Sequence, residues 1–336
     1  MSSGCLRGGG NDVRHKNIES VLYFASAVPF ALPPGGLNWR MRFSFCIAVI
    51  AAVVSTCGQT HAAAPCDEFV ARLPNVKRAL CEAANLQPSA AKSVEGRTLW
   101  ARDIKADNSV LRVLVIGAIH GDELSSASVA LHWLRLAEQG VFDMPQAVHW
   151  RFIPALNPDG LFHQPPRRVN ANGVDLNRNF PTPNWERDAK AYWEKRTRKD
   201  PRRYPGVTPL SEPESRFLHE EMQRFKPQLI VSIHAPYGVL DFDGPKNGGF
   251  VPPSRLGRLY LDQVGIFPGS LGNYGGVHKG VPVVTVELPN STRTPLDAEM
   301  RQMWLDLLRW MSERVGKNLP EGAGFASGSG TATRSP

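Results

Sequence analysis

The chain has little cysteine, no visible internal repeat and no long hydrophobic run. Only five of its 336 residues are cysteine. Its most marked apolar stretch, residues 43–54, is too short to anchor a protein across a bilayer. No run of Lys and Arg with interleaved aromatic residues is present, which argues against a nucleic-acid partner.

The N-terminal segment has the pattern of a secretory signal peptide. Residues 1–40 show no periodicity and are expected to be a disordered extension upstream of the true start at Met41. Arg40 and Arg42 flank the apolar residues 43–54, and small residues follow up to Ala64. A basic flank, a short apolar core and an Ala-rich exit are typical of a signal peptide. We therefore expect residues 41–64 to direct export to the periplasm, with cleavage near Ala64.

The mature chain is mildly basic and long enough for one domain. Five of the 39 Lys and Arg residues and two of the 31 Asp and Glu residues precede residue 65, which leaves a net charge of +5. This charge suggests attraction to an anionic partner such as cell-wall polymer. Removing 64 of the 336 residues leaves 272, which suits one catalytic domain at residues 65–318. The Gly-, Ala-, Ser- and Thr-rich residues 319–336 are expected to form a disordered tail.

Apolar and amphipathic segments alternate along this domain. We expect an edge strand at 97–104, a central strand at 111–116 and further strands at 148–154, 229–233 and 283–287. Helical segments are expected at 123–138, 211–224, 253–264 and 295–315, with a surface helix at 184–199 inside an irregular segment at 157–204. The alternation predicts an α/β fold with a mixed, mostly parallel twisted sheet flanked by helices.

Three predicted strands end in side chains that can bind a metal or move a proton. His120 and Glu123 follow the central strand, His234 ends the next buried strand and Glu287 ends a third. Ligands bind beyond the carboxyl ends of strands in such sheets. A lone histidine at a strand end is more often structural, but two histidines and a glutamate with one open position form a catalytic zinc pattern. Glu287 then suits the general base.

The irregular segment supplies arginine and carboxamide groups. Arg168, Asn177 and Arg178 occur there among Gly, Pro and Asn residues. One guanidinium can stabilise an oxyanion, and a second with an Asn donor can bind a substrate carboxylate. The alternative is a solvated arginine-rich loop.

Two cysteines, Cys66 and Cys81, remain after the signal peptide. In an exported chain they suggest one structural disulfide. Two unpaired buried thiols are the alternative. A metal role is not expected, because no neighbouring cysteine or histidine completes a site.

These motifs together resemble the zinc carboxypeptidase family of the carboxypeptidase A type. Within that family the chain is most similar to the murein peptide amidase A branch. The matching stretches are Gly-Ala-Ile-His-Gly-Asp-Glu at 117–123, Asn-Pro-Asp-Gly at 157–160, and residues 170–181, 232–236, 268–274 and 284–289. They are spread over roughly residues 97 to 315, nearly the whole mature chain.

The resemblance implies a role for each matching residue. One zinc ion would be bound by His120, Glu123 and His234, with Glu287 as the base. Arg168 would polarise the scissile carbonyl, although Arg167 competes for that role because the loop length differs from that of the pancreatic enzymes. Asn177 and Arg178 would bind the terminal carboxylate. Those enzymes also fold a tyrosine over the substrate. Tyr274, a candidate substrate contact, falls at a different point relative to the base, which leaves this role open.

The resemblance implies an exported zinc metallopeptidase that uses a zinc-activated water to hydrolyse the γ-D-glutamyl–meso-diaminopimelate amide bond of murein peptides. Diaminopimelate carries a second amine and a second carboxylate. Asp241 or Asp243 is expected to bind the distal ammonium and a loop arginine the distal carboxylate. Alternatively, both aspartates merely shape a turn.

Three other functions fit parts of the sequence. A carboxypeptidase on ordinary peptides has the same chemistry, and an aspartoacylase-like zinc deacylase pairs His-x-x-Glu with Leu-Asn-Arg. The Asn-Pro-Asp-Gly turn and the residues around His234 favour the peptidase. A non-catalytic wall-binding module would have lost a ligand or the base, and none is lost here. The sequence leaves the oligomeric state open.

Overall fold

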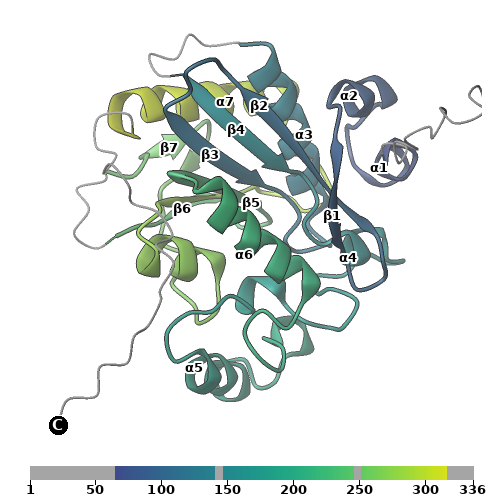
Figure 1. Ribbon diagram of the computed structural model, residues 1–336, viewed down its shortest axis with the longest axis vertical. Helices are drawn as coiled ribbons and strands as arrows, with labels where there is room; N and C mark the ends of the chain where they lie inside the picture. The colour runs from purple at the N-terminus through teal and green to yellow at the C-terminus, as the bar shows by residue number, and fades with distance from the viewer. Residues whose placement is uncertain (1–64, 141–146, 246–250, 316–336) are drawn as a thin grey trace, which may run out of the picture. The chain divides into compact units, whose positions relative to one another are not determined.

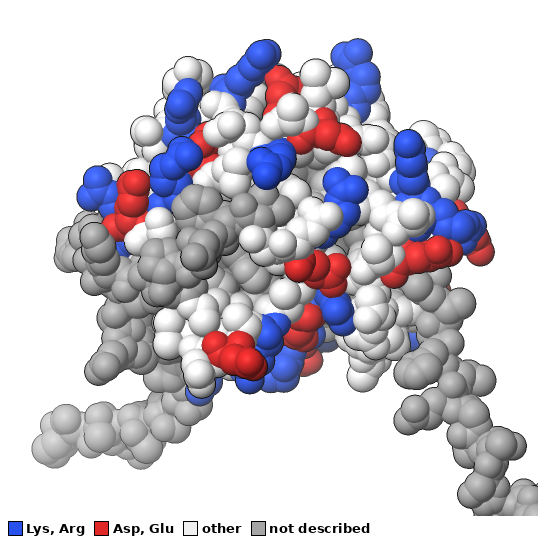
Figure 2. Space-filling view, turned by 90° about the horizontal axis from the view of Figure 1, so that it is seen from above, with Lys and Arg blue, Asp and Glu red and all other residues white. Residues whose placement is uncertain are grey.

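The computed structural model describes residues 65–140, 147–245 and 251–315 (Figure 1). The extension, the signal peptide and the tail predicted from the sequence lie outside the described residues. Within these ranges, none of the helices combines enough length with enough apolar character to cross a bilayer. The face shown in Figure 2 carries Lys and Arg side chains interspersed with Asp and Glu rather than one basic field.

A seven-stranded sheet forms the centre of the described domain, in the order β1-β2-β4-β3-β5-β9-β6. Strands β4, β3, β5 and β9 run parallel to one another, and β1, β2 and β6 add antiparallel pairings at the two sides. The bounds are β1 Gln87–Lys92, β2 Thr98–Lys105, β3 Leu111–Ile116, β4 Val148–Ile153, β5 Leu229–His234, β6 Val239–Asp243 and β9 Val283–Glu287. The mixed sheet with a parallel centre, flanked by helices, confirms the predicted fold class.

The central strand β3 is buried on both faces because helices cover both sides of the sheet. Val113 and Val115 belong to one hydrophobic core, with α3 (Leu124–Glu138) and α7 (Asp297–Trp310). Leu114 and Ile116 belong to a second core, with α6 (Pro213–Phe225) and the π-helix η4 (Gly272–His278). Successive side chains of a strand point to opposite faces, so an unbroken apolar run is needed here.

The N-terminal part of the described domain is two short helices joined by a disulfide. Helix α1 spans Cys66–Arg72 and α2 spans Arg78–Ala83. The structure joins Cys66 to Cys81, with 5.6 Å between their Cα atoms. Both cysteines belong to the α3–α7 core. The disulfide therefore ties the start of the domain to its main body.

The segment between β4 and α6 contains only short helices. They are α4 (Pro158–Phe162), η1 (Leu176–Arg178), α5 (Trp185–Ala191), η2 (Tyr192–Arg196) and η3 (Pro201–Arg203). Helices α5 and η2 lie within the helix predicted at 184–199. A final π-turn, η5 (Met311–Val315), extends α7.

The structure corrects two of the predicted elements. The strand predicted as an edge at 97–104 is β2, but β1 pairs with its outer side. Residues 253–264 do not form a helix. They contain a small hairpin, β7 (Arg255–Leu256) and β8 (Leu259–Tyr260). Gly257 turns this hairpin at φ +58°, and a Cβ there would lie 2.8 Å from Met303 of α7.

Candidate active site

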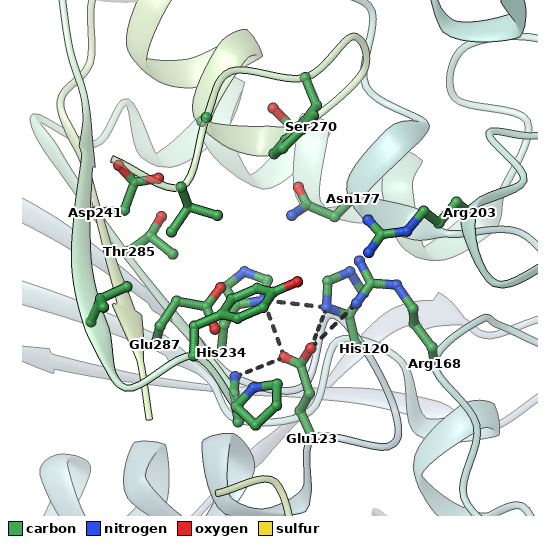
Figure 3. A pocket seen from close by; sticks show the side chains of 18 of the residues that line it. His120, Glu123, Arg168, Asn177, Arg203, His234, Asp241, Ser270, Thr285 and Glu287 are labelled. Carbon is green, nitrogen blue, oxygen red and sulfur yellow. Dashed lines mark hydrogen bonds and ion pairs between the residues drawn. The ribbon is translucent and has the colours of Figure 1, made fainter. Parts of the chain in front are cut away.

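Three buried ligands, His120, Glu123 and His234, come together beyond the carboxyl ends of β3 and β5 (Figure 3). Each is no more than 4% exposed, and their ligand atoms all lie within 4.8 Å of one another. Gly121 allows this loop to pass the backbone of the next one, since a Cβ there would collide with Gly160. The structure thus brings together the three residues predicted to bind the metal.

The Nε2 atoms of the two histidines lie within hydrogen-bond distance of neighbouring side chains. His120 Nε2 lies 3.1 Å from Asp175 Oδ1, and His234 Nε2 lies 3.0 Å from Ser232 Oγ. Both Nδ1 atoms point at Glu123, 2.7 Å from Oε1 for His120 and 3.1 Å from Oε2 for His234. This is the arrangement that orients imidazoles toward a metal. Two imidazoles and a carboxylate with their ligand atoms converging fit zinc.

Neighbouring charges keep the carboxyl groups of Glu123 and Asp175 ionised. Burial by itself would raise the pKa of Glu123, but the adjoining His120 and His234 outweigh it and lower that pKa. Burial acts against ionisation of Asp175 too, yet Arg168 and His120 hold the pKa of Asp175 well below its ordinary value. Both groups are therefore carboxylates at neutral pH. Sequence reasoning assigned no role to Asp175, although it lies inside the Val-Asp-Leu-Asn stretch at 174–177.

Glu287 lies beside His234 because the register of β5 and β9 pairs the two residues. Its side chain is buried, and burial raises the pKa of its carboxyl group. Its Oε2 atom has no hydrogen-bond partner within the described part of the chain. A buried carboxylate with a vacant oxygen and a raised pKa suits a general base.

Arg168, rather than Arg167, lines the cavity beside the three ligands. Its Nε atom donates to Asp175 Oδ2 at 3.1 Å, and its Nη1 atom lies 3.5 Å from Glu123 Oε1. The guanidinium is therefore held at the position where an oxyanion beside the metal would be stabilised. This geometry favours Arg168 of the two predicted candidates.

Asn177 and Arg178 line the same cavity as Arg168, and Figure 3 shows Asn177 on the side of Arg168 and Arg203. Asn177 Oδ1 accepts a hydrogen bond from Leu271 N at 2.8 Å, which leaves its amide donors for the cavity. Arg178 is 4% exposed and stacks 4.5 Å from the centre of the Phe267 ring. No carboxylate of the described residues forms an ion pair with Arg178, and burial lowers its pKa to about 10. A buried guanidinium with no ion-pair partner among the described residues suits an anionic ligand.

The opposite wall carries the two aspartates of β6. Asp241 and Asp243 line the cavity, which measures about 710 Å³, and Asp241 points into it near Thr285 (Figure 3). Burial, and then the charge of Asp241, raise the pKa of Asp243 to about 7. Gly272 makes room for this carboxylate, since a Cβ there would collide with Asp243. The aspartates lie on a strand, so the alternative that they shape a turn is wrong.

Tyr274 lies away from the cavity, which corrects its predicted role as a substrate contact. It is 1% exposed, stacks on Phe180 and bonds His219 Nδ1 through its hydroxyl at 2.8 Å. Two other tyrosines, Tyr192 and Tyr237, line the cavity, and Tyr237 is 59% exposed. Sequence reasoning missed both because neither lies in a matching motif.

Residues 83–242 match the family described as zinc carboxypeptidase. The chain is 30% identical over 200 residues to murein peptide amidase A of Escherichia coli K12, covering 59% of this chain and 79% of that protein. It is also 30% identical over 213 residues to murein peptide amidase A of Vibrio campbellii, covering 62% and 79%.

Among solved structures, the fold is similar to that of bovine thrombin-activatable fibrinolysis inhibitor in complex with tick carboxypeptidase inhibitor. The TM-score is 0.52 at 16% identity, covering 71% of this chain and 93% of that one. At this identity the likeness concerns the fold alone.

Proposed function

The chain belongs to the zinc carboxypeptidase family and is a zinc metallopeptidase, and from this premise we propose that it hydrolyses the γ-D-glutamyl–meso-diaminopimelate amide bond of murein peptides. The observation that carries the proposal is the charge of the cavity. Arg168 and Arg203 line one wall, Asp241 lines the other, and the His-Glu-His cluster lies between them (Figure 3). Asp243 lies two residues beyond Asp241 on β6 and also lines the cavity. Such a cavity suits a zwitterionic substrate, and the relatives in Escherichia coli and Vibrio campbellii are named murein peptide amidase A.

His120, Glu123 and His234 would hold the zinc ion, with Asp175 and Ser232 orienting the imidazoles. When bound, zinc supplies a Lewis acid that polarises a carbonyl and lowers the pKa of water. A zinc ligand must be deprotonated, and the lowered pKa of Glu123 meets this need.

The other residues of the site bind and orient the substrate and move the proton. Asn177 and Arg178 hold the carboxylate next to the scissile amide nitrogen. Arg168 stabilises negative charge that develops on the carbonyl oxygen. Glu287 removes a proton from the attacking water and delivers it to the departing amine, which leaves with its new N–H bond. Products are a peptide ending in D-glutamate and free diaminopimelate.

Asp241 and Asp243 supply selectivity for the distal ammonium of diaminopimelate. The Asp243 carboxylate has no hydrogen-bond or ion-pair partner among the described residues, and a buried unpaired charge is costly. An ammonium between the two aspartates would offset that cost and keep both ionised. A 2-aminopimelate-ended peptide offers the distal carboxylate without the ammonium. Comparing it with the diaminopimelate-ended peptide on wild type, Asp241→Asn and Asp243→Asn therefore tests this wall, and unchanged preferences would remove the aspartates from it.

The reaction is tested by product identification. Purified protein is incubated with L-Ala-γ-D-Glu-diaminopimelate, with the α-linked isomer and with an ordinary peptide ending in a free carboxylate. We expect release of diaminopimelate from the γ-linked peptide at the highest kcat/KM. Preferential cleavage of the ordinary peptide would instead identify a general carboxypeptidase, the alternative within the same chemistry. An N-acyl amino acid included in the same set tests the deacylase alternative.

We also propose that residues 41–64 direct the protein to the periplasm, where murein lies. The sequence pattern of this segment supports the proposal. N-terminal sequencing of protein recovered from the periplasm should begin near Pro65. Recovery of the intact chain from the cytoplasm would contradict it.

A further inference from the structure

The arginines of the cavity differ in how fully their charges are neutralised. Arg168 pairs with Asp175 and Glu123, and Arg202 pairs with Asp122 at 2.7 Å. Arg203 has one weak partner among the described residues, Asp200, with 3.8 Å between Nε and Oδ2. This distance is too long for a hydrogen bond. Arg203 therefore resembles Arg178 in presenting a cation to the cavity that the surrounding protein leaves largely uncompensated.

Although its side chain is weakly paired, the backbone around Arg203 is held firmly beside the metal cluster. Arg203 N donates to Asp200 O at 3.0 Å within η3, and Asp175 N donates to Tyr204 O at 2.8 Å. Asp175 is the same residue that bonds His120. The side chain is 33% exposed and points toward Arg168 and Asn177 (Figure 3). A cation fixed in this way suits recognition of a second substrate carboxylate, in addition to the one at Arg178.

We infer that Arg203 binds the free α-carboxylate of the γ-linked glutamyl residue, and so selects γ-linked over α-linked substrates. The inference rests on the proposed function. A γ-glutamyl amide keeps its α-carboxylate on the acyl side, a few bonds from the scissile carbonyl. An α-linked glutamyl residue has no carboxylate at that place. Arg203 points toward Arg168, which we assign to the carbonyl, so its guanidinium can reach a carboxylate at that place (Figure 3).

The distal carboxylate of diaminopimelate is a poorer match for Arg203. It shares a carbon with the distal amine, which the aspartates of β6 would bind. In Figure 3, Asp241 lies across the cavity from Arg203. An ammonium held at Asp241 would place the adjoining distal carboxylate nearer to that wall than to Arg203 (Figure 3), which departs from the expectation that a loop arginine binds it. The two walls would thus recognise different ends of the substrate.

The inference is tested with two tripeptides of nearly equal shape. One is L-Ala-γ-D-Glu-diaminopimelate, and the other carries isoglutamine in place of glutamate, which converts the α-carboxylate to a neutral amide. Because Arg203 is one-third exposed, we expect a modest effect, with wild-type kcat/KM about tenfold lower for the amidated tripeptide, which corresponds to about 1.4 kcal/mol. Arg203→Gln should cleave the two equally, and Arg203→Lys should recover part of the preference.

Arg202→Gln is the matched control, because Arg202 is adjacent but already paired with Asp122. It should keep the wild-type preference. A wild type that cleaves both tripeptides equally would overturn the inference, as would an Arg203→Gln variant that keeps the preference. A third tripeptide carries an amide in place of the distal carboxylate of diaminopimelate, and tests whether Arg203 binds that group instead. If wild type prefers the unmodified tripeptide to this one and only Arg203→Gln abolishes the preference, the inference is overturned. Failure of wild type to cleave any of the three would overturn the proposed function, and the inference with it.

Discussion

Replacing Asp175 by asparagine should weaken zinc binding although Asp175 is not itself a ligand. Its carboxylate bonds His120 Nε2 and Arg168 Nε, both at 3.1 Å, and accepts the backbone N–H of Asn177 at 3.0 Å. Asparagine keeps the size and one oxygen acceptor but removes the charge. Losing such a partner typically costs 10–100-fold in metal affinity. That range corresponds to about 1.4–2.8 kcal/mol.

The assay is competition between the protein and a chromophoric chelator for zinc, which gives a dissociation constant for each variant. Asp159→Asn is the control, because Asp159 is a buried carboxylate of the same segment that bonds Ser93 and Glu95 rather than a metal ligand. We expect at least tenfold weaker binding for Asp175→Asn and less than threefold for the control. Equal affinities in wild type and Asp175→Asn would refute the reasoning, and an equal loss in both variants would show that the effect is general destabilisation.

Three further predictions concern Glu287, Asp243 and the disulfide. Glu287→Gln should keep zinc, as measured by elemental analysis, while kcat falls by about 10²–10⁴-fold, and near-normal turnover would remove Glu287 as the base. Because the pKa of Asp243 is raised to about 7, its contribution to stability should be lost as pH rises from about 4 through 7. Asp243→Asn should therefore gain stability over wild type in urea denaturation at pH 8 but not at pH 4, and equal differences at both pH values would contradict this. Replacing Cys66 and Cys81 by serine opens a link between residues 15 apart and should lower the free energy of unfolding by about 3 kcal/mol, whereas an unchanged urea midpoint would show that the link contributes nothing.

The sheet centre and the ends of its strands were predictable because their signals are local. Strand β3 is an unbroken apolar run, and His120, His234 and Glu287 follow or end such runs directly in the sequence. Strand β1 was missed because it is largely exposed and contains Pro88. The hairpin at 255–260 was mistaken for a helix because Leu256 and Leu259 have the spacing of one helical face.

The neighbours that orient the site were not predictable from spacing. Asp175 and His120 are 55 residues apart, and their contact depends on how the irregular segment folds back over β3. Arg203 lines the cavity where the backbone of the next residue, Tyr204, accepts a hydrogen bond from Asp175 N, a contact between distant parts of the segment. Tyr274 was wrongly predicted to contact the substrate, because it lies in a matching motif. In the structure it packs into the core on the α6 side of the sheet. Motifs identified the reacting groups, and tertiary contacts determined which side chains surround them.

The central claim is that His120, Glu123 and His234 form a zinc site that cleaves γ-linked murein peptides. The most direct measurement follows release of diaminopimelate from L-Ala-γ-D-Glu-diaminopimelate by the metal-stripped protein before and after one equivalent of zinc is restored. We predict no release without metal and recovery with zinc in wild type but not in His234→Ala. Release by the stripped protein, or full recovery in His234→Ala, would contradict the claim.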